Sequence, residues 1–579
     1  MHKRKVWVAI VLGAALLVAA WVGWTAFRVN QDLTASVGDA TTLRSALESG
    51  NDATVDAALA DLKQHSGDAA DRTGGITWKV LQHLPLLGDD ARGVAVVSSV
   101  IDDLSGDGIA PLVEVSDNLE SIVPSNGRID PDAVAALLPP AAAAHAAFAD
   151  ADVRLSAEDP SGYVERLKSK YRELAAQVDD GARALGSAET AVRVLPTMLG
   201  SDRPQTYILV FQNNAEIRAT GGLPGAVSLV RSDDGKLLMG RQVAASSFGF
   251  TKKPVLPLTP AEREIYGDIV GTFFLDANLQ PDFPRAADLW KARWEQVQPE
   301  SIDGVLSIDP VAISYVLGAI GSISADGVTL TEENAVDQLL HEVYIRYPDP
   351  DDQDAFFRVV ARAMFDKIAG GGESPRNLMA ALAKGADEHR IYVHDFDEAV
   401  QNELAGSRVA GELLTNADTE PQVGVYFADG TGAKMSYYLR YDVDLRATYC
   451  SGDVQALTGH LRLSSEAPLD AATSLSDYIT GGGTYGVKRG DQLVFIRLYG
   501  PVNGTISAVT LDGDPITGFP AVDAEGRKVF TAVVQLKPQQ KSDLTWRMKT
   551  GPGQVGDTVL SVTPSVAENN SSSVVASSC

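Results

Sequence analysis

Polar side chains that could bind an anion follow a short apolar run near the middle of the chain. The run is Tyr207–Phe211, and its length and flanking turn residues predict a buried strand. The polar residues after it are Asn213, Asn214, Glu216, Arg218 and Thr220, followed by Gly221 and Gly222. Arginine can bind a phosphate with two parallel hydrogen bonds, and glycine lets the backbone approach an anion closely. Because open α/β sheets bind ligands at the carboxyl ends of their strands, this stretch is the first candidate anion site.

A second cluster combines acidic residues with arginines further along the chain. It begins at Arg346, and its acidic residues include Asp349 and Asp351. Arg358 and Arg362 are four residues apart, so they project from the same side of a predicted helix. Carboxylates beside arginines could hold a hydrated Mg²⁺ against a pyrophosphate. The sequence therefore favours the three arginines as anion ligands and the two aspartates as candidate metal ligands.

A third polar group, Asp276, Asn278 and Asp282, lies in a predicted loop. For all three clusters a structural role is the alternative, because a capped helix end, a solvated loop or an ion pair uses the same residue types. The chain contains no HExxH, CxxC, GxSxG or Walker phosphate-loop sequence. The sequence thus indicates a ligand class without establishing a reaction, and whether the protein is an enzyme stays open.

The charge of the chain bears on its partners. The net charge is −27, and nucleic-acid binding needs a broad basic surface, so the composition argues against nucleic acid. Between Ser201 and Lys253 the balance reverses, with seven basic residues against four acidic ones. That reversal suits a local anion site, although scatter of charges on a solvated face would give the same count.

The amino terminus predicts a membrane anchor. Residues 2–5 are basic apart from a histidine, and Val6–Phe27 carries no charge over 22 residues, which is long enough to span a bilayer. Trp7 at one end and Trp21 and Trp24 at the other match the aromatic residues of membrane interfaces. The basic cluster places the amino terminus in the cytoplasm and the bulk of the chain outside the cell membrane. A cleaved signal peptide is the alternative.

The remaining patterns divide the chain into a membrane anchor and three further regions. Residues 1–28 form the cytoplasmic tip and the anchor. Residues 29–200 are predicted to be a helical extracytoplasmic region, from apolar residues at three- and four-residue spacing. Strand and helix patterns alternate over 201–415, which predicts an α/β head, and short alternating strands over 416–579 predict a β-sandwich. The fold class is therefore multidomain, α/β plus all-β.

The chain has two cysteines, Cys450 and Cys579. In an exported protein two cysteines can pair, and closing a loop of this length is worth roughly 4–5 kcal/mol in the entropic account. The segment before Cys579 is rich in serine and asparagine and would otherwise fray. We therefore expect a disulfide, with a free terminal thiol as the alternative.

Three long motifs resemble one bacterial family. They are FQNNAEIRATGG from Phe211, DFPRAADLW from Asp282 and IDGVLSIDPVAISYVLGAIG from Ile302. Together they closely resemble the domain-of-unknown-function family numbered 4012, and the resemblance covers nearly everything after the apolar segment. That family implies no settled biochemical role.

The order of features is also remotely similar to the LytR–CpsA–Psr cell-wall ligases. Those proteins are membrane-anchored extracellular α/β proteins that transfer glycopolymers from polyprenyl pyrophosphate to peptidoglycan, usually with Mg²⁺. Their core resembles the strand Tyr207–Phe211, the polar turn, Arg218 and the predicted hairpin 226–243 of this chain. Their loop rich in arginine and aspartate, which precedes a long helix, resembles Arg346–Arg362.

The sequence departs from that ligase pattern at two points. The usual aspartate after the first strand is matched by Asn213 or Asn214, which are neutral, and Ala244–Phe248 stands where an arginine–aspartate pair is expected. These departures count against metal binding and catalysis more than against anion binding. The resemblance therefore implies a head that binds a polyprenyl-phosphate-linked glycopolymer or a similar anionic envelope ligand. The alternatives are an active glycopolymer–peptidoglycan phosphotransferase and a purely structural envelope scaffold.

Overall fold

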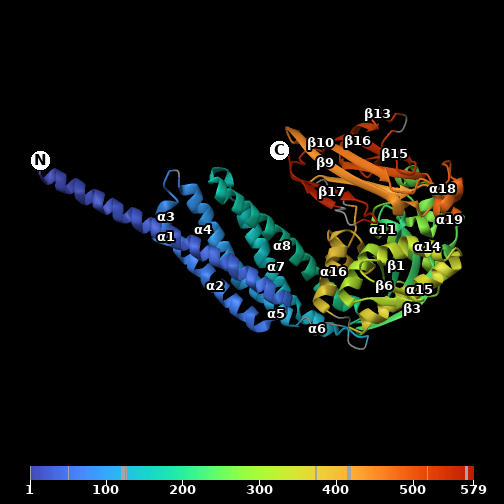
Figure 1. Cartoon of the computed structure of the whole chain (residues 1–579), viewed down its shortest axis with the longest axis horizontal. Coiled ribbons are helices and arrows are strands. Elements are labelled where there is room, and N and C mark those ends of the chain that lie inside the picture. The colour runs from blue at the N-terminus through green and yellow to red at the C-terminus, as the bar shows by residue number, and fades with distance from the viewer. Residues whose placement is uncertain are drawn as a thin grey trace. The chain divides into compact units, whose positions relative to one another are not determined.

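The computed structural model describes residues 2–49, 51–85, 87–118, 124, 127–371, 374–413, 419–517, 520–567 and 572–579, with side chains from residue 21 on except a few beside the gaps. The chain divides into two compact units. The first comprises 1–122 and 132–196, and the second comprises 123–131 and 197–579. Figure 1 shows helices in the first unit and mixed helices and strands in the second.

The first unit is helical, which confirms the helical N-terminal region predicted from the sequence. Its helices are α1 (His2–Ser49), α2 (Asp52–Gly74), α3 (Ile76–Leu81), α4 (Gly88–Asp103), the π-helical turn η1 (Leu104–Ile109), α5 (Ala110–Asn118), α6 (Pro131–Ala136), α7 (Leu138–Ser156), the 3₁₀ turn η3 (Pro160–Gly162) and α8 (Glu165–Met198). Their buried side chains form three clusters, centred on Leu62, on Trp78 and on Tyr171. Apolar residues at helical spacing thus supply the contacts between neighbouring helices.

The predicted membrane span Val6–Phe27 lies within α1, and the side chains of its residues up to 20 lie outside the described part. Within the described part, one helical segment is long and apolar enough to cross a membrane by length and composition, residues 131–156. This segment owes its apolar character to alanines, and it buries Ala144, Ala151 and Leu155 in the helical unit. A bundle helix and a membrane helix both satisfy that test.

A five-stranded sheet organises the first half of the second unit. Its strand order is β3-β2-β1-β4-β7, and the strands are β1 (Gln205–Arg218), β2 (Gly221–Asp233), β3 (Lys236–Ala244), β4 (Gly304–Ile308) and β7 (Ile391–Asp395). β1 pairs with β4 in parallel, whereas the other pairs are antiparallel. The predicted turn between β2 and β3 is present, with positive φ at Asp234 and Gly235.

The first strand is longer than predicted, and this corrects the sequence analysis. β1 does not end at Phe211 but continues through the polar residues to Arg218 and pairs with β2. Two register shifts interrupt the pairing, and residues 214–216 have no partner in β2. A β-bulge of this kind bends the strand and redirects its side chains. The polar stretch is therefore the second half of a bent strand and not an open strand end.

Helices cover both faces of this sheet. On one face, Ile208 and Val210 of β1 pack with the buried Trp290 and Trp294 of α11 (Phe283–Val297). On the other, Phe211 packs against a cluster that holds α12 (Pro310–Ile320) and α15 (Pro350–Ala369). The alternation of side chains along β1 assigns its two faces to the two helical layers.

Shorter elements connect these layers. They are η4 (Ala245–Phe248), α9 (Pro260–Tyr266), α10 (Ile269–Thr272), η5 (Phe274–Leu279), β5 (Ile323–Ala325), β6 (Val328–Leu330), α13 (Ala335–Asp337), the π-helical turn η6 (Gln338–Glu342), α14 (Val343–Arg346), α16 (Pro375–Asp387) and α17 (Glu398–Leu404). α13 starts at Ala335, and Asn334 occupies its N-cap position. The Asn334 side chain accepts a hydrogen bond from Thr331 N at 2.8 Å.

Two sheets form the strand-rich C-terminal region. One has the order β13-β12-β16-β10-β9, and the other has the order β14-β15-β11-β8-β17-β18. The strands are β8 (Gln422–Asp429), β9 (Leu439–Ser451), β10 (Val454–Ser465), β11 (Gln492–Val502), β12 (Thr505–Leu511), β13 (Asp514–Pro515), β14 (Val522–Ala524), β15 (Arg527–Leu536), β16 (Lys541–Lys549), β17 (Thr558–Val562) and β18 (Ser572–Val575). Both sheets contribute to one hydrophobic core, which includes Phe427, Leu461, Ile496 and Trp546. The predicted boundary between 415 and 416 falls outside the described residues.

Short helical turns follow β8 and β10. They are η7 (Met435–Tyr438), α18 (Ala471–Ser474), α19 (Asp477–Thr480) and η8 (Gly481–Gly483). Met435, Leu475 and Ile479 pack into the same cluster as α12 and α15. The strand-rich region and the α/β sheet therefore share buried surface within one compact unit.

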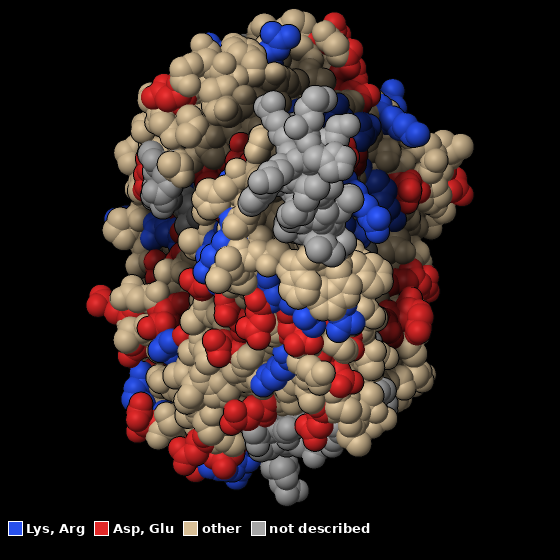
Figure 2. Space-filling model, turned by 90° about the vertical axis from the view of Figure 1, so that its left-hand side faces the viewer, with Lys and Arg blue, Asp and Glu red and all other residues tan. Residues whose placement is uncertain are grey.

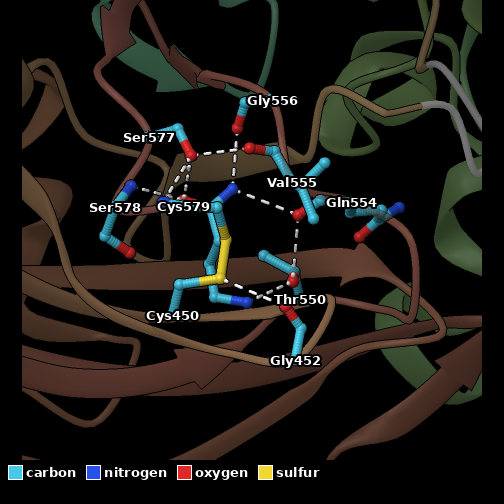
Figure 3. Close-up of a disulfide and its surroundings, with 10 residues drawn as sticks. Cys450, Gly452, Thr550, Gln554, Val555, Gly556, Ser577, Ser578 and Cys579 are labelled. Atoms are coloured by element: carbon cyan, nitrogen blue, oxygen red, sulfur yellow. Dashed lines mark hydrogen bonds between the residues drawn. A yellow bond between two sulfur atoms is a disulfide. The ribbon is translucent and has the colours of Figure 1, made fainter.

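The predicted disulfide between Cys450 and Cys579 is present (Figure 3). It joins the end of β9 to the last residue of the sequence, 129 positions away. Hydrogen bonds support the same segment, because Ser577 donates from N to Asp557 and from Oγ to the carbonyl of Val555. Ser578 N donates to the Gln455 side chain at 3.0 Å. The disulfide and these bonds together fix a polar segment that buries few side chains.

Candidate functional site

Gln212 and Asn278 hold the two polar strands together. The Gln212 side-chain oxygen accepts from Thr220 Oγ1 and from Gly222 N, each at 3.0 Å. Asn278 donates to Thr220 Oγ1 and to the Gly222 carbonyl, each at 2.8 Å. A Cβ atom on Gly222 would overlap the backbone of Asn213, so glycine is required here for close approach of β2 to β1. Thr220 and Gly222 thus help to close the hairpin between β1 and β2.

A buried network of charges occupies the far end of β1. Arg218 contacts Glu216 at 3.0 Å and Asp276 at 2.9 Å, and its side chain is only 6% exposed. Glu216 also pairs with Lys434, which follows β8. Arg218 donates further to the carbonyl of Ile217 at 3.0 Å. The guanidinium is therefore occupied by carboxylates of the protein itself, the arrangement that a buried charge requires.

Protonation in this network follows from its contacts. Burial alone would raise the pKa of Glu216, but Lys434 and Arg218 outweigh it and hold that pKa below its ordinary value. Burial would lower the pKa of Lys434, yet Glu216 outweighs burial and raises it. Burial and the nearby Glu216 raise the pKa of Asp429, whose carboxylate accepts from Thr431 N at 2.9 Å. Glu216, Arg218 and Lys434 are thus held in their charged forms.

The two asparagines of the polar stretch have separate partners. Asn214 donates to Asp309 at 3.0 Å, and Asp309 pairs with the fully buried Arg390 at 2.9 Å. Asn213 donates to the hydroxyl of Tyr344. Burial, which outweighs the nearby Lys434, raises the pKa of Tyr344 to about 12, so its hydroxyl stays protonated at neutral pH.

An apolar pocket opens beside Asn213. Its volume is about 40 Å³. Its lining consists of Phe211, Gln212, Asn213, Gly225, Ala226, Pro310, Ile313, Leu339, Phe357, Val360, Ala361 and Met364. β1, β2, α12, η6 and α15 all contribute, so the pocket lies between the sheet and the helices on one of its faces. The Gln212 and Asn213 amides are the polar side chains of an otherwise hydrocarbon lining.

Residues 202–344 match the family model described as Protein of unknown function (DUF4012). This match confirms the resemblance predicted from the sequence over residues 202–344. No curated protein and no solved structure matches the chain. The remoter similarity to the LytR–CpsA–Psr ligases stays a prediction.

The DUF4012 segment contains the polar half of β1 and one side of the pocket, but the second arginine cluster lies outside it. Arg346 is exposed and donates to Gln338 at 2.7 Å. Arg362 is exposed and contacts the Met239 carbonyl and Asp366, each at 3.3 Å. Arg358 is exposed on the same helix, α15. The described contacts place none of these arginines in the Arg218 network.

The two candidate metal ligands lie at the start of α15. The Asp349 carboxylate caps this helix by accepting from Asp351 N at 3.0 Å, and both residues are exposed. Among the described residues, the group whose ligand atoms lie within 4.8 Å of one another is Asp337, His341 and Glu342. Sequence reasoning passed over that group, although Asp337 and His341 are four positions apart, the spacing that places residues together on a helix.

The third sequence cluster is divided among structural roles. Asp276 pairs with Arg218, and Asn278 joins the two strands as described above. Asp282 caps α11 and accepts from Leu413 N at 2.8 Å, while burial raises its pKa to about 6. The residues that sequence reasoning missed, Lys434 and Tyr344, reach the DUF4012 strand from far along the chain and left no local signal.

Proposed function

We propose that the protein is a single-pass, membrane-anchored envelope protein whose α/β head binds a polyprenyl-phosphate-linked glycopolymer or a similar anionic envelope lipid. The observation that carries this proposal is the apolar pocket beside Asn213. Aliphatic and aromatic side chains such as Ile313, Leu339 and Met364 line it. A hydrocarbon lining recognises an apolar chain.

The size of the pocket narrows the ligand class. Pockets for drug-sized molecules measure roughly 300–1,000 Å³, whereas this one measures about 40 Å³. A thin, flexible chain can enter such a space when Met364 and the half-buried Phe357 change rotamer, because methionine adapts easily to irregular space. A rigid polar ligand would leave buried groups unpaired there.

The phosphate is assigned to α15 in this proposal. Phe357, Val360, Ala361 and Met364 of this helix line the pocket, while Arg358 projects outward beside them. Arg362 follows one turn later and is also exposed. Arg218 has no part in this form of the proposal, because Glu216 and Asp276 already hold its guanidinium.

The anchor and the finer fold belong to the same proposal. The uncharged segment Val6–Phe27 would cross the cell membrane and leave the remainder outside. The sheet with helices on both faces supports a head similar to the LytR–CpsA–Psr ligases, and the common core of the other two sheets supports a β-sandwich.

A binding role is preferred over transfer to peptidoglycan. The position expected to hold an aspartate is Asn213 or Asn214, and Asn214 is committed to Asp309. Asp349 caps a helix, although its exposed carboxylate and that of Asp351 could still bind Mg²⁺ in the enzymatic alternative. A purely structural scaffold is the third alternative, and it requires no ligand in the pocket.

Binding of a short fluorescent polyprenyl phosphate to the full chain in detergent tests the proposal. Val360→Gln, which places an amide in the pocket, should weaken binding at least tenfold, and Phe357→Gln gives a second lining variant at a half-buried position. The matched control is Val359→Gln on the exposed side of the same helix. Equal affinities for lining and control variants would exclude the pocket. Release of a glycan from a lipid-pyrophosphate donor with Mg²⁺ would instead select the enzyme.

A further inference from the structure

The helical unit concentrates its exposed apolar side chains in one place. Seven of the ten large hydrophobic side chains exposed in the described part of this unit lie within residues 21–27, in the middle of α1, or on α3 and the segment after it. They are Trp21, Trp24, Phe27, Ile76, Val80, Leu84 and Leu87, and we call them the apolar collar. Phe27 is 64% exposed and Ile76 is 85% exposed. Apolar surface gathered in this way marks an interaction site.

Direct contacts join the two parts of the collar. Trp21 Nε1 donates to Thr77 Oγ1 at 3.3 Å, which places the start of α3 beside α1. The opposite face of α3 is buried, because Trp78 and Leu81 pack with Val29 of α1. Trp78 also donates to the Ala91 carbonyl of α4 at 2.7 Å. These contacts fix α3 with Ile76 and Val80, which are four residues apart, turned away from the unit.

The position of the collar along α1 identifies what covers it. The uncharged segment Val6–Phe27 ends at the collar, so Trp21, Trp24 and Phe27 occupy the level at which a spanning helix leaves the bilayer. Tryptophan is enriched at that level because its ring is apolar and its N–H is polar. Lys79 is exposed between Ile76 and Val80 and can extend its ammonium to the head groups.

We propose that the collar lies in the outer interfacial layer of the membrane and seats the helical unit on the bilayer surface. This inference rests on the proposed anchor, and it adds that α3 and the following segment are a second, peripheral membrane contact. Figure 2 shows the side of the molecule that lies at the left of Figure 1, with acidic side chains spread over the lower part of the view. Two contacts prevent the unit from pivoting freely about its anchor.

Depth-dependent quenching in the full chain, reconstituted into phospholipid vesicles, tests this assignment. An environment-sensitive fluorophore is attached at Ile76→Cys or Val80→Cys without reduction of the native disulfide, and nitroxides in the acyl chains quench it. Both positions are exposed, so the label does not enter a core. The controls are Val37→Cys and Val153→Cys, which are similarly exposed outside the collar, and Ala15→Cys inside the predicted span.

Quenching at residues 76 and 80 should be several-fold above that at residues 37 and 153, with strong quenching at residue 15. This result would support the location of the collar in the membrane interface. Strong quenching at residue 15, with residues 76 and 80 at the level of residues 37 and 153, would overturn the membrane contact of the collar and would still support the membrane-spanning segment. No quenching at 15 would overturn the anchor itself. A blue shift at residue 76 that grows with protein density and resists lipid nitroxides would assign the surface to a second copy and overturn the membrane assignment.

Discussion

Two polar regions of this protein contain arginines and acidic residues in similar proportions, yet their surroundings differ completely. In the polar half of β1, Arg218 is buried and contacts Glu216 and Asp276. On α15, Arg358 and Arg362 are exposed and the residues beside them line an apolar pocket. The first region neutralises its own charges, whereas the second leaves cations facing solvent.

The difference teaches that residue type alone does not mark a binding site. A buried charge is stable only with a fixed partner, so a satisfied arginine inside a fold contributes to architecture. An exposed arginine gains little from a surface ion pair and keeps its capacity to bind an anion. If this contrast is correct, variants in the first region change stability and variants in the second change binding.

The largest effect should come from the buried pair of Glu216 and Lys434. Lys434→Met removes one partner of a buried ion pair and should lower the free energy of unfolding by about 3–5 kcal/mol. Urea denaturation followed by tryptophan fluorescence measures it. Arg446→Gln, which breaks an exposed pair with Asp444, should cost less than about 1 kcal/mol. Equal costs for the two variants would show that the β1 network is not specially stabilising.

The same network should make stability depend on pH in a defined direction. The folded pKa of Glu216 is lowered, so its contribution is present above its unfolded pKa of about 4.3 and is lost as pH falls through the folded value. The folded pKa of Lys434 is raised, so its contribution is present below about 10.4 and is lost as pH rises through the folded value. Urea midpoints between pH 3 and pH 7 should fall less steeply on acidification in Glu216→Gln than in the native chain. Parallel curves would contradict this assignment.

Local patterns predicted much of the secondary structure, and they failed where distant segments supply the partners. The strand at Tyr207–Phe211 and the turn at Asp234 and Gly235 both follow from neighbouring residues. The continuation of β1 to Arg218 does not follow from neighbouring residues. Polar residues can stay in a buried strand there because partners such as Lys434, which binds Glu216, reach them from more than 200 positions away.

The sequence likewise predicted some parts of the candidate site and not others. The family segment and the arginines of α15 were visible in the sequence, because motif and helical spacing are local properties. The pocket was not visible, because its walls come from strands and helices that extend from Phe211 to Met364. An apolar residue at helical spacing looks the same whether it meets a neighbour or an empty space, so only the tertiary arrangement separates the two.

A smaller loss of stability is expected at Gln212. Gln212→Ala removes two hydrogen bonds of the β1–β2 hairpin and leaves the Thr220 hydroxyl and the Gly222 amide without their acceptor. Leaving buried donors unsatisfied costs about 1–3 kcal/mol. The same urea titration measures this loss, with Gln298→Ala as the control, because the Gln298 side chain accepts a solvent-exposed hydrogen bond from Arg241. If Gln212→Ala and the control lower the free energy of unfolding by amounts within about 0.5 kcal/mol of each other, water replaces the lost hydrogen bonds.

The smallest effect on stability should come from the arginines of α15. Variants of these arginines test most directly whether exposed arginines serve binding and not stability. Arg358→Gln and Arg362→Gln should change the free energy of unfolding by no more than about 0.5 kcal/mol, because both side chains are exposed. Binding of a polyprenyl phosphate should nevertheless weaken by roughly tenfold for each variant, since a hydrogen bond to a charged group contributes about 1.5–3 kcal/mol. Affinity for the uncharged polyprenol should stay unchanged, because the pocket that holds its chain is intact. Weakening of both ligands together would mean that α15 has lost its shape, and weakening of neither would move the anion site away from α15.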